Sequence, residues 1–185
     1  GYDRVPMEYI KKHHIQIFNA RGVYSIPMAE FAVWGVLSLY KKSHFFVKNQ
    51  AEKQWVKNRD LLELFNKTIC IIGCGSVGTE CAKRFQSFGC KVIGVDINPY
   101  KSTDFENIFP IEDLNSVLSK SDIVVLTVPL TRKTFHLLDD ERFSHLKKGT
   151  IIVNISRGAL IKTETLLAAL KNQLMGAVLD VFEEE

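Results

Sequence analysis

The sequence contains no long apolar run, and this absence argues against a protein that spans a membrane. No stretch reaches the roughly 18 consecutive apolar residues that a membrane helix needs. The chain does not open like a signal peptide either, because no apolar segment follows residues 1–4. A starting methionine is also absent, as it would be in a fragment of a longer protein. We therefore expect no membrane partner.

A strong excess of charge of one sign is equally absent. Lysine and arginine number 24, and aspartate and glutamate 21, which leaves a net charge of only +3. This balance argues against a nucleic-acid partner and against a polybasic membrane surface. With 185 residues, 46% of them hydrophobic and 24% charged, the chain is typical of a soluble globular protein of one domain or slightly more.

The cysteines lack the spacing of a metal site. They are Cys70, Cys74, Cys81 and Cys90, and no two of them have the C-x-x-C spacing. No nearby histidine or second cysteine pair completes a zinc site, so we expect no metal. We interpret the four as small buried side chains in a reducing, cytoplasmic environment.

Two short elements and one long helix are expected near the start of the chain. Residues 6–13 favour a short helix, and residues 15–18 favour a short strand. Ser25 is a plausible N-cap of the long helix, which has Pro27 in its first turn and extends to about Tyr40. Its apolar side chains surround much of its circumference, so it must be buried in a core or against a partner.

Beyond the long helix, the polar stretch 41–66 is expected to form a further helix and a surface connection. From Lys67 onward, short apolar segments alternate with helical patterns. Strands that are apolar throughout must be buried on both faces, and alternation with helices indicates a parallel sheet covered on both sides. The expected strands are residues 68–72, 91–95, 123–127, 150–154 and 177–181, and the expected helices are residues 76–88, 111–119 and 163–171.

A glycine-rich loop joins the first of these strands to the helix that follows. Gly73, Gly75 and Gly78 have the G-x-G-x-x-G spacing, and they lie in the strand-to-helix context that the motif requires. The first glycine permits a tight turn, the second lets backbone approach a pyrophosphate, and the third lets the helix pack close to the sheet. Ser76 and Val77 lie where N–H groups of the helix N-terminus would meet the pyrophosphate.

The second strand leads into Asp96, which lies 18 residues beyond Gly78. A carboxylate there can accept hydrogen bonds from both adenosine ribose hydroxyls and would repel a 2′-phosphate, which favours NAD over NADP. The alternative is that the glycines form an ordinary tight turn and Asp96 caps a loop. The pattern predicts an α/β fold, a Rossmann-type doubly wound parallel sheet that forms a single nucleotide-binding domain for NAD.

Four further segments carry recognisable motifs. They are residues 19–30 (NARGVYSIPMAE), 122–134 (DIVVLTVPLTRKT), 153–160 (VNISRGAL) and 179–185 (LDVFEEE). In this order and spacing they resemble the D-isomer-specific 2-hydroxyacid dehydrogenases, and the resemblance covers nearly the whole chain. It implies the NAD-binding part of an oxidoreductase that transfers hydride between NAD(H) and a D-2-hydroxy acid or 2-keto acid.

By this resemblance, Arg157 is the catalytic arginine and Glu185 is the catalytic glutamate. A guanidinium can bind the carboxylate of a 2-keto acid through paired hydrogen bonds and polarise its carbonyl oxygen. The glutamate of the family orients a histidine and stabilises its protonated form. An ordinary salt bridge is the alternative for Arg157, and a solvated charge run is the alternative for residues 183–185.

The resemblance also implies further contacts to the cofactor. Val128 and Pro129 would lie along the adenosine side, although both equally suit the end of a core strand. Asp180 would accept a hydrogen bond from the nicotinamide carboxamide. The remaining residues assigned to the cofactor site in this way are Thr134, Ile155 and Ser156, the last two on the nicotinamide side.

The same resemblance divides the chain into three parts. Residues 1–25 correspond to a crossover, hinge and first strand, residues 26–66 to a dimer-type helix and connection, and residues 67–185 to the Rossmann core. The substrate domain is expected outside the sequence, and so is the acid–base histidine, because all five histidines precede Asp180. The piece should therefore bind NAD without turnover. Because the long helix packs against its twofold mate in the family, we expect a homodimer, with burial under the chain's own domains as the alternative.

Two other functions are compatible with the sequence. A non-enzymatic NAD sensor, like the corepressor relatives that bind NAD and recruit partners, would retain Arg157 without turnover. A different NAD enzyme, such as an alanine dehydrogenase or a homocysteine-ester hydrolase, would share the glycine loop but not the run 154–160.

Overall fold

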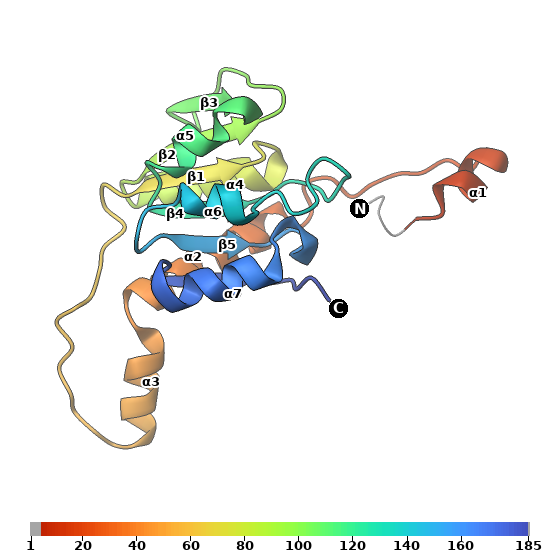
Figure 1. The fold of residues 1–185 in the computed structure, drawn as a ribbon. Coiled ribbons are helices and arrows are strands. Elements are labelled where there is room, and N and C mark those ends of the chain that lie inside the picture. The colour runs from red at the N-terminus through yellow and green to blue at the C-terminus, as the bar shows by residue number, and fades with distance from the viewer. Residues whose placement is uncertain (1–4, 185) are drawn as a thin grey trace.

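The computed structural model describes residues 5–184, and a six-stranded parallel sheet forms its centre. The strand order is β3-β2-β1-β4-β5-β6, so the chain moves outward from β1 in one direction and from β4 in the other (Figure 1). This is the doubly wound order that the sequence predicts. The strands are β1 (Thr68–Ile72), β2 (Lys91–Asp96), β3 (Asn107–Pro110), β4 (Ile123–Leu126), β5 (Ile151–Asn154) and β6 (Gly176–Leu179).

Helices cover both faces of the sheet, and each face has its own apolar cluster (Figure 1). Successive side chains of a strand point to opposite faces. In β1, Ile69 and Ile71 therefore join one cluster, and Cys70 and Ile72 join the other. The prediction of strands buried on both sides is confirmed. The helices are α2 (Ser25–Tyr40) and α4 (Ser76–Ser87) on the first face, and α5 (Leu114–Leu118), α6 (Asp140–Ser144) and α7 (Thr163–Asn172) on the second.

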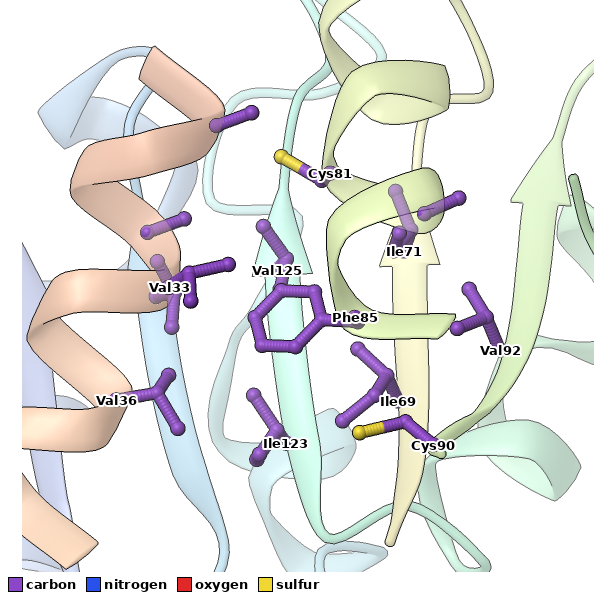
Figure 2. Packing of buried hydrophobic residues seen from close by; sticks show 14 of the residues in the cluster. Val33, Val36, Ile69, Ile71, Cys81, Phe85, Cys90, Val92, Ile123 and Val125 are labelled. Atoms are coloured by element: carbon purple, nitrogen blue, oxygen red, sulfur yellow. The ribbon is translucent and has the colours of Figure 1, made fainter. Parts of the chain in front are cut away.

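The first cluster holds α2 and α4 against the sheet. Figure 2 shows the ring of Phe85 from α4 between side chains of β1 and β4, such as Ile69 and Val125, all of them fully buried. Gly35 brings α2 still closer, because a Cβ on this residue would lie 2.2 Å from Cγ1 of Val178 in β6. These contacts hold both helices in place against the sheet, and the two helices start near the edge of the sheet described below.

The first part of the chain agrees with the sequence in its helices but not in its expected strand. The helix expected over residues 6–13 is α1 (Met7–Lys12), and the polar stretch contains α3 (Ser43–Ala51) and an irregular connection. The strand predicted for residues 15–18 is wrong. This segment pairs with no strand among the described residues, and its apolar side chains are exposed, with Phe18 86% accessible.

Two further expectations need correction. Ser25 is the first residue of α2 and not its N-cap, which is Tyr24, and the hydroxyl of Ser25 has no hydrogen-bond partner in the described structure. The expected loop after β2 contains the short edge strand β3, followed by a 3-10 turn, η2 (Ile111–Asp113). The sheet therefore has one strand more than the sequence indicated. Among residues 5–184, no helix is both long and apolar enough to cross a membrane.

Candidate cofactor site

The predicted site residues gather at one edge of the sheet, where the parallel strands have their carboxyl ends. β1 leads into Gly73, β2 ends at Asp96, β4 leads into Val128, β5 into Arg157 and β6 into Asp180. β1 and β4 are neighbours, and the chain leaves them in opposite directions. The crevice between them is the switch point at which open parallel sheets bind ligands.

The glycine loop has the backbone geometry that the motif predicts. Gly73 has φ +98°, which favours glycine, and a Cβ on it would lie 2.9 Å from the carbonyl carbon of Thr127. A Cβ on Gly78 would lie 2.1 Å from the carbonyl oxygen of Gly73. Gly75 faces open space, with no atom within 4 Å of an added Cβ. The open cradle and the N-terminus of α4, which no side chain caps, together fit a dinucleotide pyrophosphate.

Asp96 ties the end of β2 to this loop. Its Oδ2 accepts a hydrogen bond from the backbone N of Cys74 at 2.8 Å, and its Oδ1 accepts one from the backbone N of Asn98 at 3.0 Å. Asp96 therefore caps the turn, and each oxygen keeps a second lone pair for a ribose hydroxyl. Burial, together with the nearby Asp96 charge, raises the pKa of the Cys74 thiol to about 12, so the loop carries no thiolate.

The residues after β4 lie beyond the core strand, which ends at Leu126. Val128 is half-buried and Pro129 is exposed. The hydroxyl of Thr134 donates to the carbonyl of Pro129 at 2.7 Å and accepts from the backbone N of Thr131 at 2.7 Å, so it closes a turn in this segment. These contacts hold the segment together beside the crevice.

Arg157 lies just beyond β5, in a loop with several fixed contacts. Its Nη1 donates to the carbonyl of Ser156 at 2.7 Å, and its own carbonyl accepts from Nδ2 of the buried Asn154 at 2.8 Å. The hydroxyl of Ser156 donates to the carbonyl of Leu126 at 3.1 Å, which ties the end of β5 to the end of β4. The chain then forms a short 3-10 turn, η3 (Gly158–Leu160).

Three further predicted residues, two at the nicotinamide side and the catalytic glutamate, differ in what the structure shows of them. The side chain of Ile155 is buried in the first apolar cluster, so only its main chain is left to face a cofactor. Asp180 is exposed, and its backbone N donates to the carbonyl of Asn154 at 3.0 Å, which places it beside β5. Glu185, the predicted catalytic glutamate, lies outside the described residues.

Two chain segments enclose the turn that follows Arg157. On one side, a Cβ on Gly158 would lie 1.8 Å from the carbonyl carbon of Phe182, so the segment after β6 crosses directly over this glycine. On the other side, the backbone N of His136 donates to the carbonyl of Ala159 at 2.8 Å. The turn is therefore held between residues from the loop after β4 and residues from the end of the chain.

Glu183 joins these two segments to each other and to α7. Its Oε1 lies 2.5 Å from Nε2 of His136, and its Oε2 accepts from the hydroxyl of Thr163 at 2.5 Å and from the backbone N of Thr163 at 3.1 Å. The hydrogen bonds from Thr163 and from His136 lower the pKa of Glu183. Glu183 is therefore a structural anchor, and not part of a solvated charge run.

Sequence patterns gave no sign of this anchor or of Tyr100, whose hydroxyl donates to the carbonyl of Cys74 at 2.6 Å. Glu183 is 47 residues from His136 and 20 from Thr163, so only the fold brings them together. The described residues contain no cluster of three or more metal-ligating side chains, and all four cysteines are free and buried, as predicted for their side chains.

The order of the strands, the switch point and the glycine loop define a dinucleotide-binding domain of the Rossmann type. Residues 33–185 match the model of one family, described as "D-isomer specific 2-hydroxyacid dehydrogenase, NAD binding domain". The chain belongs to this family, and NAD is the cofactor of its domain. The resemblance seen in the sequence is confirmed at this level.

Named relatives agree with the family. A glyoxylate reductase from Thermofilum pendens is 37% identical over the whole chain, which spans 57% of that protein. A D-lactate dehydrogenase from Streptococcus agalactiae is also 37% identical over the whole chain, which spans 57% of it. The crystal structure of D-lactate dehydrogenase from Aquifex aeolicus, complexed with NAD and lactic acid, superposes with a TM-score of 0.87. It is 29% identical, and the match covers all of this chain and 56% of that structure. The chain thus spans just over half the length of these proteins.

The lowered pKa of Glu183 leads to a prediction about stability and pH. Stabilisation by a carboxylate with a lowered pKa is present above its unfolded pKa and is lost as the pH falls through its folded pKa. We expect Glu183→Gln to lower the melting temperature by about 2–4 °C at pH 7. At pH 3, below the ordinary pKa of a glutamate, the wild type should have lost part of this advantage. Thermal unfolding followed by circular dichroism at both pH values measures the difference.

Glu184→Gln is the matched control, because this neighbouring glutamate is exposed and has no hydrogen bond or ion pair within the described part of the chain. It should melt with the wild type at both pH values. A gap between Glu183→Gln and the wild type that is as large at pH 3 as at pH 7 would contradict the role given to the Glu183 charge.

Proposed function

We propose that this chain is the cofactor half of an enzyme that reduces a 2-keto acid to a D-2-hydroxy acid and also runs the reverse reaction. The observation that carries this proposal is the position of Arg157 at the carboxyl end of β5, on the same edge of the sheet as the glycine loop. The names of the relatives, a glyoxylate reductase and D-lactate dehydrogenases, support this class of substrate. They give no support to a non-enzymatic NAD sensor.

In this proposal the pyrophosphate of NAD lies across Gly73, Gly75 and Gly78, against the N–H groups of Ser76 and Val77. NAD, when bound, supplies the hydride chemistry. Asp96 holds the adenosine ribose, while Val128, Pro129 and Thr134 line the adenosine side. Ser156, the main chain of Ile155 and the carboxylate of Asp180 line the nicotinamide side.

In this proposal Arg157 binds the carboxylate of the substrate and polarises its carbonyl group. A guanidinium offers paired donors to the planar carboxylate of a keto acid and one further N–H to its carbonyl oxygen. The hydrogen bond to Ser156 holds the guanidinium of Arg157, and the one from Asn154 holds its backbone, before substrate arrives, which reduces the ordering cost of binding. Glu185 would orient an acid–base histidine supplied by the rest of the protein.

Arg157 can be tested in the full-length protein with a panel of 2-keto acids. We expect Arg157→Gln to lower kcat/KM for keto-acid reduction by about 100- to 1,000-fold, the cost of losing a donor to the developing oxyanion. The NADH dissociation constant should change little. The exposed Arg59→Gln is the matched control and should keep full activity. Unchanged turnover in Arg157→Gln would overturn the role of this arginine.

We further propose that Asp96 sets a preference for NADH over NADPH. Asn at this position keeps an oxygen for the backbone N of Cys74 and removes the charge that repels a 2′-phosphate. We expect Asp96→Asn to weaken NADH binding by about tenfold and to narrow its advantage over NADPH, as measured by calorimetry. Asp96→Ala should weaken both cofactors, because it also removes the acceptor for Cys74. The idea fails if Asp96→Asn leaves the ratio of the two affinities unchanged.

We propose a homodimer formed through the outer face of α2. The inner face is buried by the chain itself, at residues such as Ala32 and Val36, which accounts for part of the apolar circumference. On the outer face Trp34 remains 60% exposed, and it lines a cavity together with Leu37 and Phe88. An exposed apolar patch of this kind is typical of a subunit interface.

The dimer can be tested by light scattering of the full-length protein after size-exclusion chromatography. Trp34→Lys should shift the protein from dimer to monomer, because it places a charge at the centre of the apolar patch. Leu167→Lys, an equally drastic change at an exposed residue of α7 on the opposite face, should leave the dimer intact. A dimer that survives Trp34→Lys would rule out this face. Four buried free cysteines suit a reducing compartment, and we propose the cytoplasm.

A further inference from the structure

Cys74, the residue that follows the first glycine of the loop, is held by two residues of β2. Its side chain is buried against Gly94, where an added Cβ would overlap the sulfur. Its backbone N donates to Oδ2 of Asp96 at 2.8 Å. The side chain and the amino side of Cys74 are therefore fixed before the chain reaches Gly75.

The peptide group that joins Cys74 to Gly75 has much less support. Glycine populates a wide range of backbone conformations, so Gly75 sets little preference for the orientation of this peptide. Its surroundings set none either, because no atom lies within 4 Å of a Cβ added to Gly75. A trans peptide group is a rigid plane whose carbonyl and N–H point in opposite directions. A flip of this plane would therefore exchange a donor for an acceptor at the surface of the loop.

Tyr100 supplies the hydrogen bond that fixes this peptide. Its hydroxyl donates to the carbonyl of Cys74 at 2.6 Å. Anywhere in residues 5–184, this carbonyl has no other donor, and the N–H of Gly75 has no acceptor. The loop therefore keeps a free donor at Gly75, while the carbonyl, which would repel an anion, is turned toward Tyr100.

We propose that Tyr100 is a positioning residue for the cofactor, whose hydroxyl fixes the Cys74–Gly75 peptide so that the N–H of Gly75, and not the carbonyl, faces a phosphate. The inference rests on the proposed path of NAD across the glycine loop. Tyr100 lies four residues beyond Asp96, in the irregular segment between β2 and β3. It acts through Cys74 and needs no contact of its own with the cofactor.

The physical effect of Tyr100 is on the populations of the two peptide orientations. Without the hydroxyl, both orientations become accessible in the free protein. A ligand that requires one of them then binds more weakly, in proportion to the fraction of the protein that holds the other. The nucleoside end of the cofactor, which Asp96 is proposed to hold, does not distinguish between the two. The loss should therefore fall on ligands that carry the diphosphate.

The role of Tyr100 can be tested with Tyr100→Phe in the full-length protein, a change that removes the hydroxyl and keeps the ring. We expect calorimetry to show NADH and ADP weakened by about three- to tenfold, the usual worth of one hydrogen bond, and adenosine within about twofold. KM for NADH should rise by a similar factor, while kcat at saturating NADH stays unchanged. Tyr9→Phe is the matched control, because the hydroxyl of this exposed α1 residue has no partner in the described structure.

The orientation of the peptide can also be followed without any ligand. In the amide NMR spectrum of the cofactor-free protein, the Gly75 signal should shift or broaden in Tyr100→Phe, because the peptide plane is released. In Tyr9→Phe the same signal should keep its wild-type position. This measurement separates an effect on the loop from a direct contact between the hydroxyl and the cofactor.

Several outcomes would overturn the proposal. The first is ADP and NADH binding by Tyr100→Phe within about twofold of the wild type. The second is a Gly75 signal that stays in place in this variant, even if the affinities fall. An equal loss of adenosine affinity would mean that the substitution acts on the fold or on the nucleoside. A wild type that binds neither ADP nor NADH would overturn the placement of NAD itself, whereas the first two outcomes overturn only the role of Tyr100.

Discussion

The structure depends on one close approach, between the third glycine of the loop and the backbone that leaves β1. Gly78 lies so near the carbonyl of Gly73 that any side chain on it would collide with that oxygen. This contact sets the first turn of α4 over the end of the sheet, and the hydroxyl of Thr127 reinforces it by donating to the same carbonyl at 2.6 Å. The N-terminus of the helix, the end of β4 and the end of β1 thereby become parts of one crevice.

The sheet could be predicted because each of its main strands is recognisable from a short stretch of sequence. Continuous apolar strands with helices between them have few solutions other than a parallel sheet covered on both faces. The doubly wound arrangement could be predicted from the glycine motif, because this motif follows the first strand of dinucleotide-binding domains. The edge strand β3 escaped prediction because Asn107–Pro110 is short and half-exposed, and its pairing with β2 supplies the stability that its own sequence does not indicate. The strand predicted for residues 15–18 was wrong for the opposite reason, because this apolar segment has no neighbouring strand to pair with in the described structure.

The residues of the site divide in the same way, into those that a short stretch of sequence identifies and those that only the fold brings together. The positions of Gly73, Asp96, Arg157 and Asp180 could be predicted, because each lies at or just beyond the carboxyl end of a strand, and these ends converge. Contacts made across the fold could not. Glu183 looked like one of three solvated glutamates, yet it caps the start of α7 and holds His136. Ile155 looked like a cofactor contact, yet burial in the core uses its side chain. Such roles depend on which segments meet, and no short window of sequence contains that information.

Gly158 shows how tightly the segments that follow β5 and β6 are linked. The backbone of Phe182 passes over it with no room for a methyl group, so the chain that carries Asp180 rests on the loop that carries Arg157. The two segments are therefore a single mechanical unit, and a shift in one is passed directly to the other. An insertion in α7 or in the turn after it would therefore have to be accommodated away from this crossing, because the crossing leaves no room for either segment to move.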